Sequence, residues 1–178
     1  MIRSALIAAL IALAPPVQAA REQPAPLQPP APPKRYAMQP VGQGTLTWFG
    51  LRVYDAALWS TSRRAKFNQP FALVVRYARA LDGAAIAERS LDEIARLGAG
   101  GAAQREAWAR QLRVLLPDVE AGDEIAGVHR PGAGARFYLN GRPLGEIADA
   151  AFSRAFFSIW LDPRTSEPEL RAALIGQR

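Results

Sequence analysis

The chain contains 178 residues, which is enough for one domain of ordinary size. The absence of cysteine excludes disulfides and thiol chemistry, and a single histidine excludes a histidine-rich metal site. The net charge of +6 comes from arginines that are interleaved with acidic residues. Because a nucleic-acid-binding protein usually gathers its basic residues into a stripe, we expect no nucleic-acid partner. Weak attraction to anionic lipid head groups is compatible with this charge.

The first part of the chain, residues 1–19, has the pattern of a secretory signal peptide. Ala5–Ala14 is an apolar run behind a positively charged residue, and a small-residue cleavage pattern predicts Ala20 as the first residue of the mature chain. The alternative is a membrane anchor, but the run has only about half of the ~20 residues that span a bilayer. We therefore expect a periplasmic or secreted protein, without stable membrane insertion after signal cleavage.

Residues 20–40 are rich in proline and hold seven of the fifteen prolines of the chain. Repeated proline favours extended conformations, so this segment is predicted to be a linker between the signal peptide and the folded part. A proline-rich ligand for a partner domain is the alternative. Residues 41–178 hold only six prolines and are predicted to form one domain.

Three strands are predicted at the start of this domain from its β-branched and aromatic residues: Thr45–Phe49, Leu51–Trp59 and Phe71–Tyr77. Gly50 lies between the first two and indicates a bend or a bulge.

Two helices follow in the sequence. The first is predicted over Ala84–Leu97, with Asp82 as its N-cap and Gly98 as its C-terminal stop. The second carries an apolar stripe that begins at Trp108, and Pro117 ends it. The acidic residues of the first helix are expected on an exposed face, where they can pair with nearby arginines. These acids are Glu88, Asp92 and Glu93, and the arginines are Arg89 and Arg96.

Strands return over 123–129, Ala135–Leu139 and Arg142–Ile147. Asn140-Gly141 supplies the two positive-φ positions of a type I′ turn and predicts a hairpin between the last two strands. Pro143 cannot donate a ladder hydrogen bond, which indicates that the last strand lies at an edge of the sheet.

Two further helices are predicted near the C-terminus. Asp149 is expected to cap a helix whose aromatic and apolar residues recur at helical spacing: Phe152, Phe156, Ile159 and Trp160. We interpret this stripe as core. A final helix is expected to start at Ser166, with Glu169 completing a capping box, and to stop at Gly176. Strands and helix pairs in this order favour an α+β domain, in which helices pack on one face of an antiparallel sheet.

Few residues suggest chemistry. His129 is interpreted as a structural or solvated residue, because the chain has no nucleophile elbow for a catalytic triad. The same face of the sheet would carry Trp48, Arg52 and Tyr54, which share one strand parity if no bulge intervenes.

The next strand offers a second pair, Arg76 with Tyr77 beside it. An arginine near a tyrosine in a cleft between sheet and helices could clamp a carboxylate or a phenolate. The alternative is that the arginines face solvent and the tyrosines cover the edges of the core.

Several short segments, taken in their order and spacing, resemble the bacterial branch of the chalcone-isomerase-like family. They are Gly50–Tyr54, the passage from Tyr77 to Leu97, Gly122-Asp123, Pro131-Gly132, Asn140-Gly141, Gly145–Phe152 and Ile159–Pro163. The resemblance spans Val41–Gly176. It implies the open-faced β-sandwich of chalcone-isomerase type, with a ligand cleft between sheet and helices, and a protein without cofactor or metal.

The same resemblance implies the loss of the catalytic groups. Leu46 stands at the position where the plant chalcone isomerases, the catalytic members of the family, carry a cationic arginine. Phe49 stands where these enzymes carry a threonine that orders water. Arg52 lies six residues beyond Leu46, about 20 Å further along an extended strand, and is not expected to replace the arginine. In the helix, Arg89 takes the place of a lysine. Losing a charged donor and a hydroxyl would typically cost several kcal/mol of transition-state binding.

The N-terminal pattern predicts an exported protein, and the resemblance implies a non-catalytic one that binds an apolar, amphipathic or carboxylate-bearing small molecule such as a fatty acid. A cofactor-free isomerase or intramolecular lyase and a structural module of the cell envelope are the alternatives. The oligomeric state is left open. The candidate ligand-binding residues are Trp48, Arg52, Tyr54, Arg76, Tyr77 and Arg89.

Overall fold

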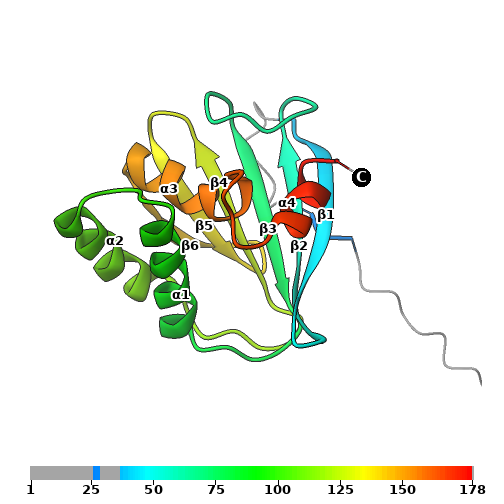
Figure 1. Cartoon of the computed structure of the whole chain (residues 1–178), viewed down its shortest axis with the longest axis horizontal. Helices are drawn as coiled ribbons and strands as arrows, with labels where there is room; N and C mark the ends of the chain where they lie inside the picture. The colour runs from blue at the N-terminus through cyan, green and yellow to red at the C-terminus, as the bar shows by residue number, and fades with distance from the viewer. Residues whose placement is uncertain (1–25, 29–36, 178) are drawn as a thin grey trace, which may run out of the picture.

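A computed structural model of the chain describes residues 26–28 and 37–177, which form a six-stranded antiparallel sheet and four helices (Figure 1). The predicted signal peptide lies outside the described residues. The strands are β1 (Gln39–Trp48), β2 (Leu51–Ser60), β3 (Phe71–Tyr77), β4 (Glu124–Arg130), β5 (Gly134–Leu139) and β6 (Arg142–Ile147). The helices are α1 (Gly83–Arg96), α2 (Ala102–Leu115), α3 (Ala150–Leu161) and α4 (Pro168–Leu174).

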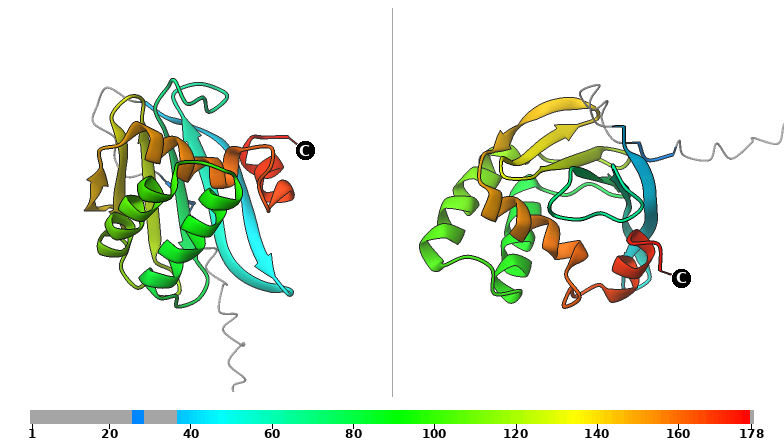
Figure 2. Two further views of the ribbon diagram at one scale, coloured as in Figure 1. Left: turned by 60° about the vertical axis from the view of Figure 1, so that its left-hand side comes forward. Right: turned by 90° about the horizontal axis from the view of Figure 1, so that it is seen from above.

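The strands lie in the sheet in the order in which they occur in the chain, from β1 to β6. All four helices lie on one face of this sheet (Figure 2). α3 packs on β4 and β5, α4 on β1 and β2, and α2 on β6, while α1 contacts α2 and α3. The predicted α+β class, with an antiparallel sheet and helices on one face, is confirmed.

Each predicted strand and helix is present, but two helix starts differ from the prediction. Asp82 occupies the predicted N-cap position of α1, but its side chain accepts no hydrogen bond from the helix. The Asp118 carboxylate accepts the Gly83 N–H at 2.8 Å instead. α4 begins at Pro168 rather than Ser166, and the predicted capping box does not form. Proline suits the first helical position, since the N–H that it lacks would be unpaired there.

The β1–β2 connection also differs from the expected bend or bulge. It is a tight two-residue hairpin turn, with positive φ values of 47° at Phe49 and 76° at Gly50. The bulge lies inside β2 instead. Leu46 pairs with Tyr54 and Thr47 pairs with Arg52, which leaves Val53 as the extra residue. A bulge of this kind reverses which face the following side chains take.

The main core lies between the sheet and the helices and is rich in aromatic residues. Phe152 and Phe157 of α3 are fully buried there with Phe137 of β5. Trp108 of α2 joins them, and its indole N–H donates to the Asp149 carboxylate at 2.8 Å. Asp149 also accepts from the first turn of α3, so the predicted cap is confirmed and it ties α2 to α3 as well.

The outer face of the sheet has a smaller apolar cluster. Leu27 is buried there against Ala57, Val74 and Ala126. Part of the segment expected to be a linker therefore packs on the sheet, and β1 begins two residues before the predicted domain boundary.

Candidate functional site

A cavity of about 580 Å³ lies between the sheet and helices α1 and α3. Its inner wall is apolar and comes from alternate residues of the central strands and from α3: Leu73, Val75, Ile125, Phe137, Phe156 and Phe157. The volume falls in the range typical of small-molecule sites, which are mostly apolar with a few placed polar groups.

Two strand features shape this wall. Leu73, Val75 and Tyr77 alternate along β3, so their side chains all point to the helix-covered face. Gly127 of β4 has no side chain at the point where the ring of Phe157 packs. A Cβ there would stand 3.1 Å from that ring, so the glycine makes room for the ring to pack on the sheet.

Two tyrosines are among the neutral polar residues of the lining, together with Thr47, Ser90 and Ser166. The rings of Tyr54 and Tyr77 meet edge to face with centroids 6.2 Å apart, and the Tyr54 hydroxyl accepts a hydrogen bond from the Trp160 indole at 3.0 Å. Burial raises the pKa of Tyr54 to about 12 and raises the pKa of Tyr77 further. Both phenols therefore stay protonated at neutral pH. Neither donates its proton to any residue that the structure describes.

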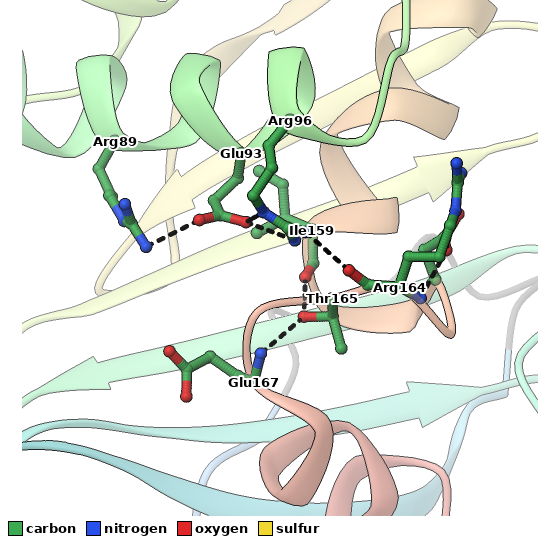
Figure 3. A network of polar contacts seen from close by, with 8 residues as sticks. Arg89, Glu93, Arg96, Ile159, Arg164, Thr165 and Glu167 are labelled. Atoms are coloured by element: carbon green, nitrogen blue, oxygen red, sulfur yellow. Dashed lines mark hydrogen bonds and ion pairs between the residues drawn. The ribbon is translucent and has the colours of Figure 1, made fainter.

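Charged residues lie at one side of the cavity, along α1 and the segment before α4 (Figure 3). Glu93 is buried, and its carboxylate pairs with Arg89 at 2.7 Å and with Arg96 at 2.8 Å. The Arg96 side chain continues to the Arg164 carbonyl at 2.8 Å, which joins α1 to the loop after α3. Glu167 also lines the cavity. The charges of Glu167, Arg89 and Glu93 all act on the Tyr54 hydroxyl, which marks this as the polar end.

The cavity reaches the surface where its lining residues are exposed. The exposed members of the lining are Thr47, Trp48 and Phe49 at the β1–β2 hairpin, Ala85 and Arg89 on α1, and Ser166 before α4. The opening is therefore bordered by three separate parts of the chain.

Four of the six predicted ligand-binding residues line this cavity: Trp48, Tyr54, Tyr77 and Arg89. Arg52 and Arg76 do not. They lie around a separate depression on the outer face of the sheet, of about 380 Å³.

Both arginines are paired there. Arg52 forms an ion pair with Asp55, and Arg76 donates to Glu124 at 2.8 Å. Because of the bulge at Val53, the side chains of Arg52 and Tyr54 point to opposite faces of the sheet, and the predicted shared parity is wrong. The clamp of Arg76 with Tyr77 does not form, because neighbouring residues on a strand point to opposite faces.

The two positions that mark the missing catalytic groups also differ in their surroundings. Both line the cavity, but Leu46 is half-buried, whereas Phe49 lies at the opening and is 93% exposed. The estimate of 20 Å between Leu46 and Arg52 was wrong, because the hairpin folds back and pairs Arg52 with Thr47 beside Leu46. Arg52 lies outside the cavity because its side chain points to the opposite face of the sheet, not because it is far from Leu46.

Two residues contribute more to the cavity than the sequence indicated. Glu93 was expected on an exposed face but is buried, although its predicted pairing with Arg89 and Arg96 is confirmed. Trp160 was interpreted as core, yet it is half-buried and lines the cavity. The signal that could have identified Glu93 is its place between two arginines at helical spacing.

His129 lies away from the cavity in the aromatic core, so the structural interpretation holds and the solvated one does not. Its Nε2 donates to the Phe67 carbonyl at 2.9 Å, since a carbonyl can only accept. Its Nδ1 therefore accepts from the Ser153 hydroxyl at 2.7 Å.

Comparison with known proteins gives a consistent result. An uncharacterized protein of Haemophilus influenzae is 29% identical over 140 residues, which cover 78% of this chain and 68% of that protein. The crystal structure of a fatty-acid binding protein of Arabidopsis thaliana superposes with a TM-score of 0.62 at 10% identity, over 78% of this chain and 86% of the other. At this identity the likeness concerns the fold alone. Residues 37–176, from before β1 to beyond α4, match the family model described as chalcone isomerase-like, and the chain therefore belongs to that family.

Proposed function

We propose that this protein binds an apolar or amphipathic small molecule, such as a fatty acid, in the cavity between its sheet and helices, without catalysing a reaction on it. The observation that carries the proposal is the cavity itself, about 580 Å³ with an apolar inner wall and a polar end. The fatty-acid binding described for the Arabidopsis protein of like fold supports this class of ligand.

The polar end suits the head group of such a ligand. Tyr54 offers a protonated hydroxyl that the Trp160 indole already orients. A carboxylate or carbonyl oxygen at this point would accept from Tyr54 and lie near the Arg89 guanidinium. The hydrocarbon tail would then extend along the apolar wall formed by Val75, Ile125 and neighbouring residues.

The state of the polar groups supports binding rather than catalysis. A general base must be able to take a proton near the working pH. The tyrosines have raised pKa values and stay protonated, and the Glu93 carboxylate is held between two guanidinium groups. These groups can orient a ligand but are poorly suited to abstract a proton from it.

A direct test is titration with cis-parinaric acid, a fluorescent fatty acid, followed by displacement with palmitate. We expect saturable binding, and we expect Tyr54→Phe to weaken it about fivefold, as the loss of one hydrogen bond does. Arg89→Met should weaken palmitate more than its uncharged methyl ester. Arg52→Met is the matched control, because Arg52 is also ion-paired, is exposed to 53% against 58% for Arg89, and lies on the opposite face.

Two results would overturn the proposal. One is the absence of saturable binding of any long-chain probe. The other is binding that Tyr54→Phe and Arg89→Met leave unchanged, which would place the ligand outside the cavity.

Cofactor-free isomerisation is the second candidate function. It is favoured by Glu167, whose carboxylate lines the cavity near Tyr54 and takes part in no ion pair among the described residues. Flavanone formation from a 2′-hydroxychalcone, compared with the spontaneous rate, tests this candidate. A saturable acceleration that Glu167→Gln abolishes would favour the enzyme over the binding protein.

We further propose that the protein is exported and acts in the periplasm or outside the cell. The N-terminal signal-peptide pattern supports this location. N-terminal sequencing of the protein from the periplasmic fraction should give Ala20 or a residue next to it. An intact Met1 in that protein would contradict the proposal.

A further inference from the structure

The exposed large apolar side chains of the described residues are concentrated at the β1–β2 turn. Trp48 is 58% exposed, Phe49 93% and Leu51 58%, and these three residues are called the apolar tip below. The other exposed residue of this kind is Val114, which stands alone on α2. Single exposed apolar residues are common on soluble proteins, but a contiguous group marks a contact surface.

The backbone of the turn makes the exposure of Phe49 more informative. Two hairpin turns within residues 37–177 have nearly the same φ values, 47° and 76° at Phe49-Gly50 and 49° and 78° at Asn140-Gly141. Asparagine suits the first of these positions because its side chain tolerates positive φ, whereas phenylalanine does not. Phe49 is 93% exposed and contributes little to the core, and its aromatic neighbour is Trp48 of the same turn, with ring centroids 6.0 Å apart. Backbone strain of this kind commonly accompanies a functional role.

Basic residues flank the apolar tip. Arg52 follows it directly in the chain. Arg79 lies at the same end of the sheet, because the neighbouring Ala78 N–H donates to the Val53 carbonyl at 2.9 Å. Arg79 is exposed and takes part in no ion pair among residues 37–177. Aromatic side chains with adjacent arginines are the combination that partitions into the interface of an anionic bilayer.

The apolar tip also borders the opening of the cavity, since Trp48 and Phe49 line it. A surface that covers the tip would therefore cover part of the opening. For a lipid surface this arrangement gives an apolar ligand a route between bilayer and cavity that avoids water.

We infer that the apolar tip docks the protein on anionic lipid surfaces, with the cavity opening turned toward the bilayer. The docking itself is independent of what the cavity holds, and only the transfer of a ligand between bilayer and cavity rests on the proposed function. The docking that we infer is peripheral and uses the apolar tip. Among the described residues, none of the helices has the length and hydropathy of a membrane span.

The test is co-sedimentation with vesicles of phosphatidylcholine mixed with phosphatidylglycerol, and with vesicles of phosphatidylcholine alone. We expect binding to the anionic vesicles that added salt weakens. Phe49→Asn should reduce the partition coefficient about tenfold or more, since it removes the most exposed ring of the tip. Arg79→Gln should reduce binding to the anionic vesicles and leave binding to the phosphatidylcholine vesicles unchanged.

Phe49→Asn keeps the variant folded, because asparagine suits the backbone of this turn, and its melting temperature should be no lower than that of wild type. Val114→Asn is the matched control, since it removes an equally exposed apolar residue elsewhere (90% exposed) and should bind as wild type does. The same N-terminal residues are present in every variant, so differences between variants report on the tip.

Equal vesicle binding by wild type and Phe49→Asn would overturn the inference. So would an absence of vesicle binding together with a dimer that Phe49→Asn dissociates in sedimentation analysis, since the tip would then serve a second copy of the chain. Titration with cis-parinaric acid in the absence of vesicles tests the cavity separately, so failure of docking and failure of ligand binding are distinguishable.

Discussion

At the scale of single residues, His129 links stability to pH. It is 3% exposed, and burial lowers its pKa below the ordinary value, with the nearby Arg154 charge acting in the same direction and the hydrogen bond to the Phe67 carbonyl opposing it. The unfolded chain takes up this proton near pH 6.5, and the folded protein takes it up only at lower pH. Between the two pKa values the unfolded state therefore binds more protons.

The sign of the effect follows from this difference. The contribution of His129 to stability is fully present above about pH 6.5 and is lost as the pH falls through the folded pKa. We expect the urea midpoint to decrease as the pH is lowered from about 7 to about 5.5. His129→Gln should make the midpoint less dependent on pH in this range. The measurement is urea unfolding at several pH values. The same dependence in both proteins would assign it to other groups.

Two aspartates show how far the sequence predicts individual contacts. Asp149 and Asp82 both precede a helix and are equally good N-cap candidates by residue type. Asp149 caps α3, but at α1 the acceptor is Asp118, which lies 35 positions beyond the Gly83 whose N–H it accepts. A local sequence pattern shows where a helix begins and that its first N–H groups need a hydrogen-bond acceptor. It does not show which distant residue folding brings there.

The candidate site shows the same limit. Tyr54, Tyr77 and Arg89 could be placed near the cavity from strand and helix patterns and from the family resemblance. Arg52 could not be excluded from the sequence, because no glycine or proline announces the bulge at Val53. Arg76 could have been excluded, since strict alternation with Tyr77 already assigns it to the other face.

At the scale of elements, α4 depends on the glycines of β1 that face it. A Cβ at Gly42 would collide with the Ala173 carbonyl and stand 2.6 Å from the Leu174 carbonyl oxygen, so the C-terminal end of α4 would have to move. We expect Gly42→Ala to lower the free energy of unfolding by about 1–3 kcal/mol, as overpacking does.

Hydrogen exchange should show faster exchange of α4 amides in Gly42→Ala than in wild type. Gly101→Ala is the control, because a Cβ there meets nothing within 4 Å. Gly101 is the N-cap residue of α2, so any loss of helix capping acts on α2 and not on α4. Wild-type exchange in α4 of Gly42→Ala would contradict the close packing of this helix on β1.

The elements themselves were predictable because each has a clear period. Alternating residues marked the strands, Asn140-Gly141 marked its hairpin, and the aromatic stripe of α3 marked an inward face. Periodicity reports which face turns inward but not whether the opposite layer fills the space. For this reason Trp160 was assigned to the core, although it borders a cavity.

At the scale of the whole molecule, the cavity leaves part of the interface between sheet and helices without packing partners. A ligand that fills it binds only the folded state. Palmitate at about one hundred times its dissociation constant should therefore raise the free energy of unfolding by about 2.7 kcal/mol. Thermal unfolding with increasing palmitate measures this effect.

The shift should be smaller in Tyr54→Phe at the same palmitate concentration, since that variant binds more weakly. Tyr138→Phe is the control, because Tyr138 packs against the outer apolar cluster of the sheet. Two results would show that palmitate does not bind in the cavity. One is a melting temperature that palmitate leaves unchanged, and the other is an equal increase in wild type and Tyr54→Phe.

The sequential strand order has a consequence for how this molecule meets others of its kind. An open sheet has two border strands, β1 and β6, whose unused backbone groups could pair with another chain. Pro40 and Pro143 lie in these strands and lack the N–H that such pairing needs. Each border strand also carries an irregularity in its register. We therefore expect the folded protein to resist fibre-like growth through its sheet, even when it is concentrated.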